Sequence, residues 1–166
     1  VVAGGKGGIA AVALYLAIYL FMNVAVFAVI LSMRVQGRAV ERIDDLAGLS
    51  STHPLVAAGL AAAMFAMAGI PPLAGFFSKF YVFEAAVRSG FYVLAVVGVL
   101  TSVFGAFYYL RIVKIMYFDE PAPAFEVPDA SVGAVVAAAT GFILFFFLIP
   151  APFVAGAGAA ALALFP

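Results

Sequence analysis

Cysteine and tryptophan are absent from this sequence of 166 residues, and histidine occurs once, as His53. Without cysteine the chain forms no disulfide and supplies no thiolate to a zinc or iron–sulfur site. A single histidine cannot build a metal site alone. We therefore expect neither a metal site nor a redox centre in this chain.

Charge is also scarce, because charged residues make up 10% of the chain whereas soluble domains contain ~25%. Eight basic and eight acidic residues balance, and no basic stripe is present, which argues against a nucleic-acid partner. Hydrophobic residues reach 67% and the mean hydropathy is +1.24. This composition predicts an all-α integral membrane protein in a lipid bilayer. Val1 stands first without a preceding basic region, so we expect the C-terminal portion of a longer protein.

Four apolar stretches are long enough to form membrane elements of one multi-pass domain. They cover residues 9–33, 54–68 together with 76–87, 91–118 and 131–149. Residues 153–165 form an apolar tail that is too short to cross again, so we expect it at the membrane interface.

The second stretch, residues 54–87, is 34 residues long, whereas ~20 residues cross a bilayer core. A straight helix of this length would measure ~51 Å. Its middle contains residues that break or bend helices. These are Gly69, Ile70, Pro71, Pro72 and Gly75. The sequence therefore predicts a discontinuous helix, with two half-helices joined by an unwound segment inside the membrane.

Lys79 lies four residues after Gly75 in apolar surroundings. A lysine inside a membrane is costly, and a broken helix beside a charge is typical of ion pathways. The alternative is that Lys79 extends its ammonium to the interface. Glu84 and Arg88 are spaced to pair with each other, whereas Lys79 and Glu84 point in different directions on a helix. Any carboxylate partner of Lys79 must therefore come from elsewhere.

Tyr15, Tyr19 and Asn23 recur every four residues of the first stretch and share one helix face. An amide at mid-membrane needs a partner, so we expect this face to point into protein. Asn23 is either an interhelical hydrogen-bonding residue or part of a proton path. Gly98, Ser102 and Gly105 form a small-residue face suited to close helix packing.

Two polar connections separate these stretches, residues 34–53 and 119–130. Residues 38–49 could form a short amphipathic surface helix, and Ser51 and Thr52 are candidate N-caps for the helix at Pro54. His53 is either a solvated loop residue or a proton relay. Basic residues accumulate in cytoplasmic loops of membrane proteins. Five lie at the two connections and two on the opposite side (Arg34, Arg38, Arg42, Arg111, Lys114; Lys6, Arg88). We therefore expect both connections in the cytoplasm and the C-terminus in the periplasm.

Residues 68–81 read Ala-Gly-Ile-Pro-Pro-Leu-Ala-Gly-Phe-Phe-Ser-Lys-Phe-Tyr. This segment resembles the broken-helix signature of the antiporter-like membrane subunits of respiratory complex I, which are similar to subunits of multi-subunit Na⁺/H⁺ antiporters. Phe80-Tyr81 and the segment Tyr108–Arg111 followed by 115–118 are similar to the subunit N branch of this family. The resemblance covers the whole chain and corresponds to the last four membrane elements of the family.

The resemblance implies a proton-translocating membrane subunit of NADH–quinone oxidoreductase in the bacterial inner (plasma) membrane. Lys79 matches the lysine of the family's second broken helix and is the expected proton-translocation residue. Further candidates for a polar axis or for packing are Tyr15, Tyr19, Asn23, Ser78 and Tyr81. FMN, iron–sulfur clusters and quinone are then expected in partner subunits, and further antiporter-like subunits among the partners. The alternatives are a subunit of a multi-subunit Na⁺/H⁺ antiporter and a purely structural membrane scaffold.

Overall fold

The computed structural model describes residues 5–35, 37–40, 42–126 and 129–164. It is predominantly helical. The long helices are α1 (Gly5–Ser32), α5 (Tyr92–Phe118) and α6 (Ala130–Phe145), which the 3₁₀ turn η2 (Phe146–Leu148) continues. The shorter ones are α2 (Leu49–Thr52), α3 (Pro54–Ala68), α4 (Ala74–Arg88) and α7 (Ala151–Leu164). A small antiparallel hairpin, β1 (Arg34–Val35) and β2 (Arg38–Ala39), and the 3₁₀ turn η1 (Ile43–Leu46) follow α1.

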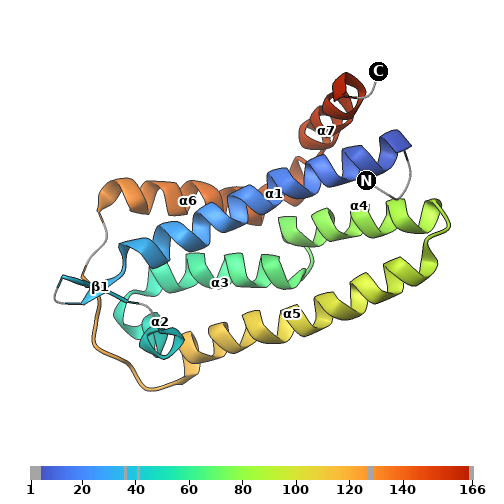
Figure 1. Ribbon diagram of the computed structural model, residues 1–166. Coiled ribbons are helices and arrows are strands. Elements are labelled where there is room, and N and C mark those ends of the chain that lie inside the picture. Colours follow the sequence, from blue (N-terminus) through green and yellow to red (C-terminus); the bar gives the residue numbers. More distant parts are fainter. Residues whose placement is uncertain (1–4, 36, 41, 127–128, 165–166) are drawn as a thin grey trace.

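The helices form a bundle whose long axes run in roughly the same direction (Figure 1). Helices α3 and α4 follow one another along the middle of the bundle, between α1 and α5 (Figure 1). Helix α1 also packs against α6 and α7, and α7 leans away from the far end of the bundle. This arrangement buries the facing ends of α3 and α4, at Ala66, Met67, Ala74 and Gly75, whereas Ile70, Pro71 and Pro72 between them are exposed.

Among the described residues, three helices are long and apolar enough to cross a membrane: α1, α5 and α6 with its η2 extension. Helices α3 and α7 are apolar but shorter. This agrees with the all-α membrane class that the composition predicts. The predicted second element corresponds to two helices of 15 residues each, α3 and α4, and the predicted tail to α7, although its residue 165 lies outside the described part.

The core lies where α1, α3, α5 and α6 meet. Its fully buried side chains include Ile18, Leu60, Met116 and Ile143. Alanines occupy much of the buried face of α3, which lets neighbouring helices approach it closely. The outer face of α5 instead exposes large apolar side chains, including Phe104 and Phe107. Such a surface requires an apolar environment.

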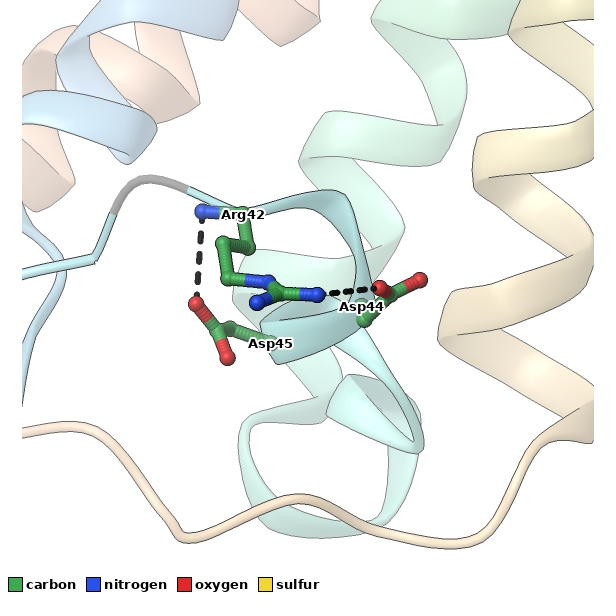
Figure 2. Close-up of polar contacts among 3 residues, drawn as sticks. All are labelled: Arg42, Asp44 and Asp45. Carbon is green, nitrogen blue, oxygen red and sulfur yellow. Dashed lines mark hydrogen bonds and ion pairs between the residues drawn. The ribbon is translucent and has the colours of Figure 1, made fainter.

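The prediction of an amphipathic helix over residues 38–49 is wrong. Residue 41 of this segment lies outside the described part. Gly37 and Gly48 adopt φ values of +74° and +62°, so each interrupts a helical backbone. Between them the described residues form strand β2 and the short turn η1, and no α-helix. The Asp45 carboxylate accepts the Arg42 backbone N–H at 3.2 Å, and the Arg42 guanidinium lies 3.4 Å from Asp44 (Figure 2). These exposed contacts hold the turn.

The N-cap role predicted for Ser51 and Thr52 is also wrong. Their hydroxyls donate back to the carbonyls of Gly48 and Leu49, because both residues lie within α2. Helix α3 begins with Pro54 in its first turn, as predicted, and His53 precedes it without a side-chain cap bond.

The two polar connections lie at the same end of the bundle and are hydrogen-bonded to each other. Ala122 donates its N–H to the Ala47 carbonyl at 3.0 Å, and Glu126 donates its N–H to the Arg34 carbonyl at 2.9 Å. Residues 127–128 of the second connection lie outside the described part. The first connection is also hydrogen-bonded to the C-terminal part of α5, where Gly48 donates its N–H to the Ile115 carbonyl.

Candidate site at the helix break

Helix α3 ends in a motif that satisfies part of its own C-terminus. Gly69 adopts the left-handed conformation, with φ +87°, and donates its N–H to the carbonyls of Phe65 and Ala66. Ile70 also donates to the Phe65 carbonyl, at 3.1 Å. This pattern is the Schellman motif, which needs a residue that tolerates a positive φ. Two of the last four carbonyls of α3 are thereby paired.

The Lys79 ammonium pairs the other two. Its Nζ donates to the Met67 carbonyl at 2.9 Å and lies 3.4 Å from the Ala68 carbonyl. Both oxygens belong to the last turn of α3, where the helix dipole is negative and favours a cation. The interrupted end of α3 and the half-buried Lys79 ammonium therefore satisfy each other. None of the three ion pairs in the described residues includes Lys79.

Two glycines make this geometry possible. A Cβ on Gly75 would lie 1.9 Å from the Ala66 carbonyl oxygen, so only glycine lets the start of α4 touch the end of α3. A Cβ on Gly69 would lie 3.2 Å from Cδ of Lys79, which places the lysine stem directly against the left-handed turn. Ser78 is 1% exposed, and its hydroxyl donates to the Gly75 carbonyl at 2.8 Å.

Lys79 borders a polar cavity of about 220 Å³ between α1, α4 and α5. Six of the ten lining residues carry hydroxyl groups. The lining residues are Tyr15, Tyr19, Met22, Met67, Ser78, Lys79, Thr101, Ser102, Gly105 and Tyr109. Each water occupies ~30 Å³ of liquid, so the cavity has room for several waters.

The hydroxyls on α4 and α5 present acceptor sites to this cavity. Thr101 and Ser102 both donate to the Gly98 carbonyl at 2.9 Å, as Ser78 does to Gly75. A hydroxyl has one donor and two lone pairs, so each remains able to accept a hydrogen bond. An ammonium beside such acceptors and a water-sized space can exchange a proton with water.

The structure brings together four of the predicted site residues, Tyr15, Tyr19, Ser78 and Lys79. It does not bring Asn23 to the cavity. The Asn23 amide donates to the Tyr19 carbonyl one turn back in α1, at 2.7 Å, so its partner lies in its own helix rather than in a neighbour.

Tyr81 also lies elsewhere. It lines a separate hollow of about 260 Å³ near the ends of α1 and α4, together with Glu84 and Arg88. Glu84 and Arg88 pair there at 2.7 Å, as their spacing predicts. His53 is half-buried beside Phe125, with ring centroids 6.1 Å apart, rather than a freely solvated loop residue.

Sequence reasoning missed Thr101 and Tyr109 and read Ser102 only as a packing residue. The spacing of Ser102, Gly105 and Tyr109 places them on one face of α5. That periodicity could have identified this face of α5, but not that the face lies beside Lys79. Gly98, by contrast, does serve packing, because a Cβ there would lie 2.6 Å from the Phe83 ring.

Within the described residues no group of three or more His, Asp or Glu side chains is placed to hold a metal ion. The described part of the site offers one ionisable cation, the Lys79 ammonium, beside a hydroxyl-lined cavity.

Comparisons with known proteins identify relatives of this chain. Residues 1–105 match the family model described as the membrane region of NADH:quinone oxidoreductase and Mrp antiporters. The NADH-quinone oxidoreductase subunit N of Paramagnetospirillum magneticum is 62% identical over the whole chain, and that of Rhodospirillum rubrum is 57% identical over 99% of it. The chain spans about a third of the length of these relatives, 34% in each case.

Two solved structures have similar folds. Respiratory complex I from Thermus thermophilus matches with a TM-score of 0.77 and 29% identity, over 88% of this chain and 34% of that one. The Mrp complex from Dietzia sp. matches with a TM-score of 0.81 and 23% identity, over 95% of this chain and 38% of that one. At that identity, the Mrp likeness concerns the fold alone.

Proposed function

Because the chain belongs to the NADH:quinone oxidoreductase/Mrp antiporter membrane family, we propose that it forms part of a proton-translocating subunit of an NADH–quinone oxidoreductase. The observation that carries the proposal is the Lys79 ammonium, which is held at the interrupted end of α3 and borders a hydroxyl-lined cavity. A structural scaffold needs neither the interruption nor the charge.

The redox enzyme is favoured over an Na⁺/H⁺ antiporter by identity along the chain. The relatives at 62% and 57% identity bear the name of subunit N, whereas the Mrp structure is 23% identical. The antiporter remains the second candidate, since the same lysine could exchange protons there without electron transfer. Purification decides between them, because flavin and iron–sulfur absorbance in the assembled complex accompanies the redox enzyme only.

In the membrane, α3 and α4 together act as one discontinuous element, which gives four elements with α1, α5 and α6. Each half-helix has 15 residues and is ~23 Å long, too short to cross a ~30 Å core alone. Their end-to-end arrangement provides the full length (Figure 1). Unpaired backbone groups at the break are tolerated only inside protein or beside water, and Lys79 supplies the pairing there.

The contact between Lys79 and the end of α3 depends on the protonation of the lysine. While protonated, it has three N–H donors and a charge that the helix C-terminus attracts. When the proton leaves, that attraction is lost and the two carbonyls of Met67 and Ala68 lose their cationic partner. A hydrogen bond to a charged group contributes ~1.5–3 kcal/mol. Proton release thus frees the side chain to move within the cavity, and rebinding draws it back.

The surrounding complex supplies what this chain lacks. FMN, iron–sulfur clusters and quinone belong to partner subunits, and further antiporter-like subunits adjoin this one in the bacterial inner membrane. The connections at 34–53 and 119–130 face the cytoplasm, and α7 lies at the periplasmic interface. A cysteine introduced at the exposed Ser51 should react with an impermeant thiol reagent from the cytoplasmic side, and one at Gly90 from the periplasmic side; the reverse pattern would contradict this orientation.

The test of the function is proton uptake into inverted membrane vesicles during NADH oxidation. Lys79→Ala should abolish most of the uptake, and quinone reduction insofar as it is tightly coupled. NADH oxidation by an artificial acceptor, which needs only the partner subunits that bind NADH, should persist. Lys79→Arg should permit assembly yet lose much of the pumping, because a guanidinium does not release its proton in proteins. Normal assembly and unchanged pumping by Lys79→Ala would overturn the proton-site role.

A further inference from the structure

An apolar groove of about 600 Å³ runs between α1, α3 and α6, away from the Lys79 cavity. Small and aliphatic side chains make up most of its walls, and many of them come from α6. Its lining residues are Val29, Ser32, Leu55, Val56, Ala58, Gly59, Asp129, Ala130, Val132, Gly133, Val136, Ala137, Thr140, Gly141 and Leu144.

One end of the groove lies beside a second, charged hollow of about 400 Å³. Ser32, Asp129 and Val132 line both spaces, so the two adjoin. The charged hollow adds Arg34 and Glu126. It lies where α1 ends at Ser32 and α6 begins at Ala130, which is the polar end of the bundle.

The charged end is held in place by hydrogen bonds to the main chain. The Glu126 carboxylate accepts the Gly37 N–H at 2.7 Å, and the Glu126 N–H donates to the Arg34 carbonyl. The hairpin that carries Arg34 is thereby joined to the loop that precedes α6. The hollow contains one guanidinium and two carboxylates, from Arg34, Glu126 and Asp129.

We propose that this groove binds one phospholipid whose headgroup carries both a phosphate and an amine, such as phosphatidylethanolamine. An acyl chain lies in the apolar part, the phosphate contacts Arg34, and the ammonium lies between Glu126 and Asp129. A guanidinium suits phosphate. An anionic headgroup without an amine would leave the two carboxylates uncompensated.

The dimensions agree with an acyl chain. From Val132 to Leu144 the groove follows thirteen residues of α6, and the twelve steps between them measure ~18 Å. Half of a bilayer core is ~15 Å thick, so the groove is about one leaflet deep.

The experiment uses the complete, assembled complex, purified in detergent, with phosphatidylethanolamine counted by mass spectrometry per complex. Arg34→Ala should lose one lipid molecule, and Ala137→Phe, which fills the groove, should lose the same one. The matched controls, Arg38→Ala on the same hairpin and Ala138→Phe on the adjacent position of α6, should lose none, because neither residue lines the groove.

Rebinding to the delipidated complex then tests the headgroup. Phosphatidylethanolamine should bind at least fivefold more tightly than phosphatidylglycerol, and Arg34→Ala should weaken its binding. Equal lipid counts in Ala137→Phe and Ala138→Phe would overturn the proposal. So would equal affinity for the two lipids, or a helix from the remainder of the longer protein seated in the groove. If Ala137→Phe does not assemble, an unchanged lipid count in Arg34→Ala suffices to overturn it.

Discussion

The two cations of helix α4 are nine residues apart and are held in different ways. Arg88, whose side chain is 78% exposed, pairs with the Glu84 carboxylate one turn earlier in the same helix, at 2.7 Å. Lys79 is half-buried and donates to main-chain carbonyls at the end of another helix. The first pair needs only the spacing of two side chains along α4. The second needs a helix that ends inside the bundle.

This difference determines how much each contact matters. An exposed pair at this spacing contributes ~0.3–0.5 kcal/mol, because water solvates both groups well in its absence. Removing the Lys79 ammonium takes away hydrogen bonds from a charged group to two carbonyls at a helix end, and such a bond contributes ~1.5–3 kcal/mol. The interior cation therefore stabilises the break, while the surface cation adds little.

The largest expected effect comes from a substitution that forces the two half-helices α3 and α4 apart. Gly75→Val would place a side chain on the Ala66 carbonyl, and backbone cannot give way as a side chain can. We expect at least about a tenfold loss of assembled complex, since overpacking costs ~1–3 kcal/mol even where side chains can shift. Native gels of solubilised membranes measure it.

The matched control is Gly156→Val in α7, where a Cβ meets nothing within 4 Å. If both variants assemble equally well, the close contact between α3 and α4 does not hold the break.

A smaller effect is expected from the left-handed turn that ends α3. Gly69→Ala forces an L-residue to φ +87°, which costs ~1–2 kcal/mol, and brings its Cβ to 3.2 Å from Lys79 Cδ. We expect a few-fold reduction of NADH-driven proton uptake. Gly69→Asn should retain more uptake, because asparagine tolerates the left-handed conformation better. Equal uptake by the two variants would show that the turn conformation is not limiting.

The smallest effect belongs to the surface pair. Arg88→Ala should change complex assembly and proton uptake by less than about twofold, because the pair contributes ~0.3–0.5 kcal/mol. The informative measurement compares it with Lys79→Ala in the same vesicles. Losses of similar size in both variants would abolish the distinction between the two cations.

The amino-acid sequence by itself determined the helical membrane class, the place of the interruption and the pair Glu84–Arg88. These follow from apolar run lengths, from glycine and proline, and from the spacing of residues in one helix. Local signals failed in the polar connection, where left-handed backbone at Gly37 and Gly48 replaced the amphipathic helix. For Asn23 they left two alternatives open, and in the described residues its amide donates to the Tyr19 carbonyl of its own helix.

Only the tertiary structure decided what surrounds Lys79. From the sequence we looked for a carboxylate partner, because charged side chains can be identified from the sequence alone. Within the described residues the partners are the carbonyl oxygens of Met67 and Ala68. Every residue possesses a carbonyl, but in a helix it becomes available only where the helix stops. Thr101, Ser102 and Tyr109 line the same cavity because α5 packs beside both α3 and α4. The rotation of one helix against another depends on side-chain packing along its whole length, which the sequence of one helix does not show.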